Sequence, residues 1–115
     1  MPREIFSILA ALVAVFRERV RQYRLWGRQE HELIVPIDKT LDEEREAYDD
    51  KAWLFKELCN RRAEERKDDW RTILFEEVYE LLAEDKLDRQ IAEAVQVSAV
   101  AAEIAERLKR KRREP

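Results

Sequence analysis

Residues 70–102 read WRTILFEEVYELLAEDKLDRQIAEAVQVSAVAA, and this pattern predicts two antiparallel helices joined by a turn near residues 84–88. Apolar side chains recur on the first helix at intervals of three or four residues. The same helix carries Glu76, Glu77 and Glu80, and the second helix carries Glu93 and Gln96. The apolar positions of the first helix are Leu74, Val78, Leu81 and Leu82.

Residues three apart lie on one face of a helix, as Glu77 and Glu80 do on the first helix. Glu93 and Gln96 have the same spacing on the second. If the helices fold back on each other, three carboxylates and one amide converge among apolar side chains. Repulsion and desolvation then require a cation, and oxygen ligands favour Mg²⁺, with Mn²⁺ as the alternative. The competing interpretation is a solvated acidic surface, because charged runs on helices usually face water.

The composition predicts one all-α domain over residues 1–115. Hydrophobic residues make up 45% of the 115 residues and charged residues 43%, with one glycine and three prolines, so helix formers abound and helix breakers are scarce. The net charge of −3 argues against general nucleic-acid binding, which needs basic surface. A single cysteine, Cys59, excludes an intrachain disulfide and is typical of the cytoplasm. We expect Cys59 to be a partly buried core residue.

The N-terminal region predicts a broad amphipathic helix. Residues 5–16 are apolar but too few to span a membrane, which needs about 20 apolar residues. The apolar periodicity continues to Tyr23, which favours one helix over a cleaved leader. Its wide apolar surface favours burial against more than one neighbour, with another subunit among the candidates.

This helix should end near Gly27, the only glycine. Gln22, Trp26, Gln29 and His31 surround that end, and such amide, aromatic and imidazole groups can line a pocket for a base or a sugar. The alternative is that Trp26 fills the core and His31 is a solvated loop residue. Because His31 is the only histidine, a metal site built on several histidines is excluded.

Two further helices are expected around a connector that contains Pro36. We expect Leu33, Ile34, Val35 and Ile37 of the connector to lie over the core. A capping box of Thr40 and Glu43 predicts a helix from there to about Arg66. Its candidate buried residues are Ala47, Leu54, Phe55 and Leu58, with Trp53 as an addition.

The ends of the remaining helices are marked by charged residues. Arg61 and Arg62 belong to a run of mixed sign that predicts an ion-paired surface, with phosphate binding as the alternative. Asp69 suits the N-cap of the helix that begins at Trp70. The last helix should run to Leu108 and beyond, where residues 107–113 are basic and complement the helix dipole rather than bind nucleic acid.

Three motifs in order along residues 17–108 are similar to those of a known family. The first is an Arg-Gln pair followed by Trp-Gly-x-Gln, the second is Trp-x-x-Ile-Leu-x-Glu-Glu-Val-x-Glu, and the third is Glu-x-x-Gln-Val-x-Ala-Val. With them the chain resembles the MazG-like all-α nucleoside triphosphate (NTP) pyrophosphohydrolases, in particular short members of the actinobacterial type. The matching residues are Arg21, Gln22, Trp26, Gly27 and Gln29; Trp70, Ile73, Leu74, Glu76, Glu77, Val78 and Glu80; and Glu93, Gln96, Val97, Ala99 and Val100.

The resemblance implies a four- to five-helix bundle of the all-α NTP pyrophosphatase type, assembled as a homodimer or homotetramer. It also implies Mg²⁺-dependent hydrolysis of a nucleoside triphosphate between the α- and β-phosphates, giving a monophosphate and pyrophosphate. Glu77, Glu80 and Glu93 would then hold the metal, with Glu76 as a further ligand or a group behind the ligands. Glu76 or Glu80 would act as general base.

Gln96 departs from the wider superfamily, which has an aspartate ligand at this position. An amide oxygen can bind a hard cation but brings no charge, so we expect a lower metal affinity. Two functions of different classes follow. The first is the pyrophosphohydrolase, and the second is a non-catalytic helical oligomer that binds a nucleotide or a protein. A plain interaction bundle with an accidental acidic motif is a third possibility.

Overall fold

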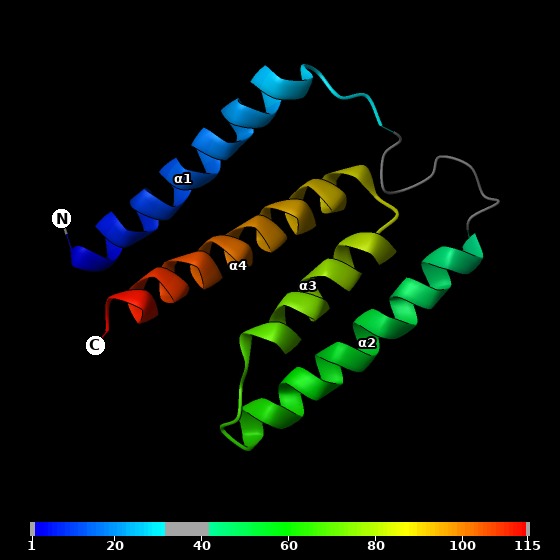
Figure 1. Ribbon diagram of the computed structural model, residues 1–115. Helices are drawn as coiled ribbons and strands as arrows, with labels where there is room; N and C mark the ends of the chain where they lie inside the picture. The colour runs from blue at the N-terminus through cyan, green and yellow to red at the C-terminus, as the bar shows by residue number, and fades with distance from the viewer. Residues whose placement is uncertain (1, 32–41, 115) are drawn as a thin grey trace. The chain divides into compact units, whose positions relative to one another are not determined.

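The computed structural model describes residues 2–31 and 42–114, with side chains from residue 44 onward in the second segment. These residues form four helices and no strand, which confirms the predicted all-α class (Figure 1). The Thr40 capping box and the apolar residues 33–37 lie outside the described residues. The helices are α1 (Arg3–Trp26), α2 (Asp42–Glu64), α3 (Trp70–Ala83) and α4 (Leu87–Arg113).

The chain divides into two compact units that share α4. One unit comprises residues 1–31 and 101–115, so it holds α1 and the C-terminal half of α4. The other comprises residues 32–100, so it holds α2, α3 and the N-terminal half of α4. The single domain expected for residues 1–115 stays a prediction.

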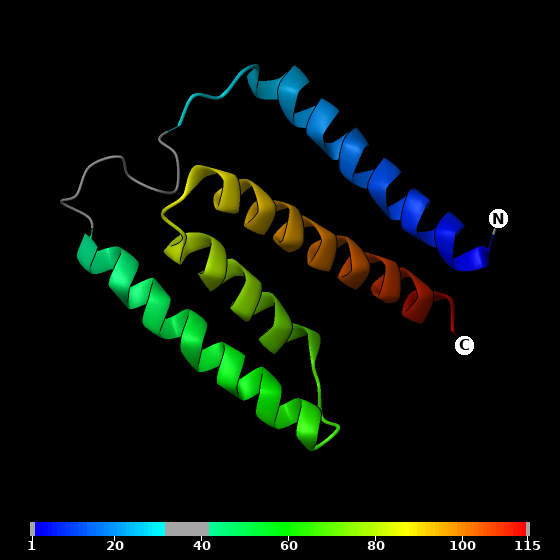
Figure 2. The same ribbon diagram turned by 180° about the vertical axis from the view of Figure 1, so that it is seen from behind.

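An antiparallel hairpin of α2 and α3 is the core of the second unit, as Figure 2 shows from behind. The ring centroids of Phe55 and Phe75 lie 5.0 Å apart, and those of Phe55 and Tyr79 lie 5.5 Å apart, with nearly parallel planes. Tyr48 extends this stack, with its ring centroid 6.4 Å from that of Tyr79. Ala52, between Tyr48 and Phe55 on α2, is buried, and its small side chain lets the helices approach closely.

The predicted buried residues of α2 are partly wrong. Phe55 and Leu58 are half-buried as expected, but Ala47 and Leu54 are exposed and Trp53 is 65% exposed. The packed face of α2 is rotated from the predicted one and repeats at steps of three or four residues. It runs through Arg45, Tyr48, Ala52, Phe55, Cys59 and Arg62.

The connection between α2 and α3 closes with a Schellman motif that lacks glycine. The N–H of Lys67 donates to the carbonyl of Arg62 at 2.8 Å, and the N–H of Arg66 donates to that of Ala63 at 3.1 Å. This pattern requires the left-handed conformation at Arg66, whose φ is 56°. Because a side chain is strained there, glycine would fit better.

Asp69 caps α3, as predicted. Its carboxylate accepts the backbone N–H of Thr72 at 2.8 Å and also accepts the Thr72 hydroxyl. The guanidinium of Arg62 pairs with the same carboxylate. These contacts, led by the backbone hydrogen bond from Thr72, hold the pKa of Asp69 below its usual value.

In the first unit, α1 and the C-terminal half of α4 lie antiparallel (Figures 1 and 2). Ala11 of α1 and Ala102 of α4 are buried. α1 ends where predicted, at Gly27, which has a φ of 65° and donates its N–H to the carbonyl of Tyr23. None of the helices in the described segments has enough length and apolar character to cross a membrane.

Replacing Arg66 by glycine should stabilise the hairpin. Arg66→Gly removes the strain of a left-handed residue, which outweighs the extra entropy of glycine in the unfolded chain by about 0.5–1 kcal/mol. Urea denaturation measures the gain. Lys67→Gly is the control, because Lys67 has no positive φ and should lose stability instead. A loss of stability in Arg66→Gly would contradict the Schellman closure.

Truncating Phe55 should destabilise the hairpin far more than truncating Trp53 two residues earlier. We expect Phe55→Ala to cost about 2–3 kcal/mol, because it removes the centre of the aromatic stack. Trp53→Ala should change stability by less than about 0.5 kcal/mol, since its side chain is largely solvated. Thermal and urea unfolding of both variants measures the two losses of stability. If they were equal, Trp53 would be as important to the core as Phe55, as the sequence-based prediction of the buried face implied.

Candidate functional site

The structure brings together three of the predicted metal ligands. Glu77 and Glu80 project from α3 and Glu93 from α4, and one carboxylate oxygen of each lies within 4.8 Å of the other two. All three side chains are half-buried. The cluster lies within residues 32–100 and therefore belongs to a single unit. The predicted convergence of these carboxylates is thus present in the geometry.

The turn between α3 and α4 is braced by side chains on both sides. Glu84 accepts the backbone N–H groups of Asp85 and Lys86 at 3.2 Å, and its own carbonyl accepts the Gln90 amide at 3.1 Å. Arg45 of α2 forms an ion pair of 2.7 Å with Asp85. These contacts limit how the two helices can separate at the turn, and so they support the approach of Glu93 to α3.

Each carboxylate of the cluster makes the ionised form of its neighbours less stable. Burial, followed by the negative charge of Glu77 and its neighbours, raises the pKa of Glu80 to about 7. Burial and the nearby Glu93 also raise the pKa of Glu77. The cluster therefore favours protonation or a cation over three free negative charges.

The donor set is suited to a hard divalent cation. Oxygen ligands 2.0–2.1 Å from Mg²⁺ can be at most about 4.2 Å apart, so small side-chain rotations would bring the carboxylates into range. Mn²⁺ accepts the same ligands. The three carboxylates come from two helices and are half-buried rather than fully solvated. The Mg²⁺ they would hold stays a prediction.

Glu76 connects the cluster to α2 through Cys59. After burial and the charge of Glu77, the proximity of Glu76 helps to raise the pKa of Glu80, and Glu76 also helps to raise the pKa of Cys59. Burial is the larger cause for Cys59 and raises the pKa of its thiol to about 12. Cys59 is half-buried, as predicted, and carries no reactive thiolate at neutral pH.

Gln96 follows Glu93 by three residues on α4 and is exposed. Its place among the ligands stays a prediction.

The residues predicted to bind the base and the ribose lie in the other unit. Gln22 is half-buried, and its amide donates to Glu18 at 3.1 Å. Trp26 is 57% exposed, with the guanidinium of Arg21 5.9 Å from its ring centroid, so Trp26 does not fill a core. Gln29 and His31 are exposed. Their role in substrate binding stays a prediction.

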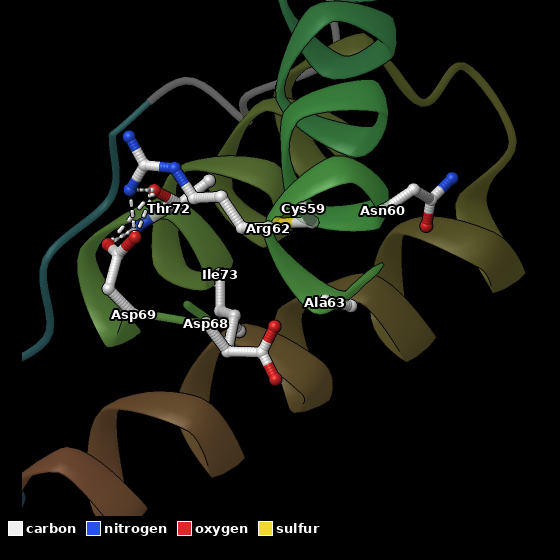
Figure 3. Close-up of a pocket in the computed structure, with 8 residues that line it drawn as sticks. All are labelled: Cys59, Asn60, Arg62, Ala63, Asp68, Asp69, Thr72 and Ile73. Atoms are coloured by element: carbon white, nitrogen blue, oxygen red, sulfur yellow. Dashed lines mark hydrogen bonds and ion pairs between the residues drawn. The ribbon is translucent and has the colours of Figure 1, made fainter. Parts of the chain in front are cut away.

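Arg62 takes part in a polar cluster that sequence analysis did not identify. Figure 3 shows its guanidinium facing the Asp69 carboxylate and the Thr72 hydroxyl, to which it donates at 2.9 Å. Its charge is therefore matched within the hairpin, which supports the ion-paired interpretation over phosphate binding. The signal in the sequence is the Asp-x-x-Thr cap of α3, which places an acid near the end of α2. A hollow of about 220 Å³ beside it is lined by Cys59, Asn60, Arg62, Ala63, Asp68, Asp69, Thr72 and Ile73.

Comparison with known proteins adds no further assignment. No protein-family model, curated protein or solved structure matches the chain. The function is therefore argued from the acidic cluster and from the motif resemblance alone.

Neutralising Glu80 should stabilise the metal-free protein at high pH only. The folded chain keeps the Glu80 proton up to about pH 7, whereas the unfolded chain loses it near pH 4.5. The stability contributed by this protonated group is complete below pH 4.5 and is lost as the pH rises to 7. With EDTA present, Glu80→Gln should add about 1 kcal/mol at pH 8, a figure reduced for solvent screening, and much less at pH 5.

Urea denaturation at both pH values measures this difference. Glu57→Gln, which changes an exposed glutamate of α2, is the control and should behave alike at pH 5 and pH 8. A Glu80→Gln variant that loses stability at pH 8 would show that the cluster is not repulsive.

Proposed function

We propose that the chain is an Mg²⁺-dependent nucleoside triphosphate pyrophosphohydrolase of the MazG-like type. It would cleave between the α- and β-phosphates and release a nucleoside monophosphate and pyrophosphate. The observation that carries the proposal is the convergence of Glu77, Glu80 and Glu93 from two helices, within 4.8 Å and half-buried. The motif resemblance supplies the reaction, because the same three residues occupy its metal positions.

Each acidic residue has a defined part in this proposal. Glu77, Glu80 and Glu93 would hold Mg²⁺ or Mn²⁺, and the bound metal would polarise phosphate oxygens. Glu76 or Glu80 would accept a proton from the attacking water. Glu76 is close enough to Glu80 to help raise its pKa, which supports this role because a second carboxyl stands next to the proton acceptor.

The proposal includes the substrate side, the assembly and the location of the protein. Gln22, Trp26, Gln29 and His31 would contact the base and the ribose. The protein would act in the cytoplasm as a homodimer or homotetramer, on free nucleotides rather than on nucleic acid or membranes. The net charge of −3 supports the exclusion of nucleic acid.

Gln96 favours a second candidate, a non-catalytic bundle that binds a nucleotide or a protein. Its amide is neutral and exposed, so it adds no charge to hold the metal. Loss of one acidic ligand is a direct route from an enzyme to a binding protein, because the fold and the remaining carboxylates persist.

The test of catalysis is pyrophosphate release from a panel of ribo- and deoxynucleoside triphosphates with Mg²⁺ or Mn²⁺. The wild type should release pyrophosphate, and the Glu77→Ala, Glu80→Ala double variant should lose at least about 100-fold in kcat/KM, because it lacks two metal ligands. Glu44→Ala with Glu57→Ala, two exposed changes on α2, is the matched control and should keep the activity. If the folded wild type released no pyrophosphate from any nucleotide, the proposed catalytic activity would be refuted.

Gln96→Asp and a metal titration separate the two candidates. In an enzyme this change should lower the Mg²⁺ concentration needed for half-maximal rate by about tenfold, because it adds a charged ligand. In a binding protein it should create activity where there was none. In either case Mg²⁺ should raise the Tm of the wild type, because a ligand of the folded state stabilises it. An unchanged Tm at every Mg²⁺ concentration would indicate a plain interaction bundle.

A further inference from the structure

A hollow of about 210 Å³ lies within the first unit, where α1 begins and α4 ends. The start of α1 and the end of α4 lie side by side in both ribbon views (Figures 1 and 2). Among the described residues that line the hollow, Glu106 is the one acid, and four are cations. These cations are Arg3 of α1 and Lys109, Arg110 and Arg113 of α4.

The glutamates near the end of α4 are already matched by cations of the same segment. Glu106, with a side chain only 15% exposed, pairs with Arg110 and so adds no free negative charge to the hollow. Residues 101–114 contain six lysines and arginines but three glutamates, so half of these cations exceed the acids. The three ion pairs have N–O distances of 3.2 Å for Arg107–Glu103, 3.6 Å for Arg110–Glu106 and 3.1 Å for Lys111–Glu114.

Three unmatched cations converge on the hollow. Lys109 and Arg113 lie four residues apart on one side of α4, and Arg3 lines the hollow from α1. Within the described segments, none of the three forms an ion pair. Like charges at this helical spacing destabilise a helix, and Lys109 is half-buried, which raises the cost of its charge. The arrangement therefore costs stability unless an anion is bound.

The helix dipole explains the cations of α4 but not the cation of α1. Lys109 and Arg113 lie in the last turns of α4, where positive charge is favourable. Arg3 is the first residue of α1, where the dipole disfavours positive charge. Its place in the lining of this hollow is explained by a shared anion that Arg3 contacts together with the two residues of α4.

The chemistry of the lining suits a small phosphate anion. The guanidinium groups of Arg3 and Arg113 match pairs of phosphate oxygens, and Lys109 adds a point charge. The half-buried Ser7 also lines the hollow and supplies a hydroxyl donor. Three unmatched charges suit a multiply charged anion better than a single carboxylate. Pockets for drug-sized ligands measure roughly 300–1,000 Å³, so the occupant of this smaller hollow should be small.

We propose that the hollow between the start of α1 and the end of α4 binds a small phosphate anion through Arg3, Lys109 and Arg113. Ser7 donates a further hydrogen bond, and Arg110 stays paired with Glu106. Because its ligands come from both helices, the anion joins α1 to α4 and stabilises the first unit. The acidic cluster lies in the other unit, so the inference does not rest on the metal site or on the nucleotide chemistry proposed above.

Calorimetric titration of the whole chain with pyrophosphate, in EDTA and about 0.15 M salt, tests the site. The wild type should bind the anion, and Lys109→Gln with Arg113→Gln should bind it at least about tenfold more weakly, because hydrogen bonds to charged groups are lost. Lys111→Gln with Arg112→Gln is the matched control. It removes two charges from the same helix end but outside the lining, and exposed charges are largely screened at this salt concentration. It should therefore bind like the wild type.

Arg3→Gln separates a site shared by two helices from simple attraction to a basic tail. It should also weaken binding about tenfold, and unchanged binding would overturn the shared site. Equal losses in the two double variants would show attraction to the tail as a whole and would likewise overturn it. Circular dichroism verifies the helical content of every variant.

Two further measurements define the ligand. Citrate, a tricarboxylate, should bind more weakly than pyrophosphate, and equal affinity would overturn the assignment to phosphate. Absence of binding and of any rise in Tm up to about 10 mM pyrophosphate would overturn the proposal altogether. The Glu77→Ala, Glu80→Ala variant should bind pyrophosphate as the wild type does, so this site and the proposed catalysis can fail independently.

Discussion

The stacking of Phe55 on Phe75 and Tyr79 sets the orientation of α3, and the acidic cluster depends on that orientation. Phe75 and Tyr79 lie on one side of α3, and Glu77 and Glu80 lie on a side roughly 100° or more away. Once the rings are packed on α2, the carboxylates cannot turn toward α2 and instead approach Glu93 of α4. The aromatic contacts thus hold charges together that would otherwise separate.

Small residues and polar end contacts do much of the packing that large side chains do in other bundles. Among the described residues, the buried hydrophobic ones are Ala11, Ala52 and Ala102. Alanine permits a close approach of helices but buries little area, so each helix pair gains modestly from its core. The Asp69 cap and the ion pair between Arg45 and Asp85 add stability at the ends of the helices, where the backbone is least satisfied.

Helix caps and helix stops predicted most of the fold. It was harder to predict which face of each helix packs against which neighbour. The sequence correctly predicts three helix boundaries: the N-cap at Asp69, the end of α1 at Gly27 and the turn after residue 83. Helix caps and stops can be predicted because they depend on a few neighbouring residues. The buried face of α2 was misplaced because hydropathy favoured Leu54 and Trp53 over Tyr48 and Ala52. A tyrosine and an alanine pack well only against a particular neighbour, and a single sequence does not show which neighbour that is.

The acidic cluster was predictable because a glutamate pair, Glu77 and Glu80, precedes the turn at helical spacing and a Glu–Gln pair, Glu93 and Gln96, follows it. The pairing of Arg62 with Asp69 was not, since an arginine in a run of mixed charge has many possible partners until the Schellman turn positions it. Pattern alone also could not relate Trp26 to the carboxylates, because these residues fall in separate units. Residue spacing predicts which side chains gather around one turn, whereas contacts between distant segments depend on packing.

As a ligand of the proposed site, Gln96 would change its electrostatic balance in two opposite ways. Three carboxylates around a divalent cation leave one net negative charge, whereas a fourth carboxylate in place of the amide would leave two. The amide would therefore weaken the hold on the metal but would also reduce the repulsion that a polyanionic triphosphate meets on approach. Because burial already raises the pKa of Glu80, a fourth charge would further increase the cost of the metal-free state. Under the proposed function, a neutral residue here would suit a site that binds its metal together with the nucleotide, since the phosphates would bring the remaining oxygen ligands.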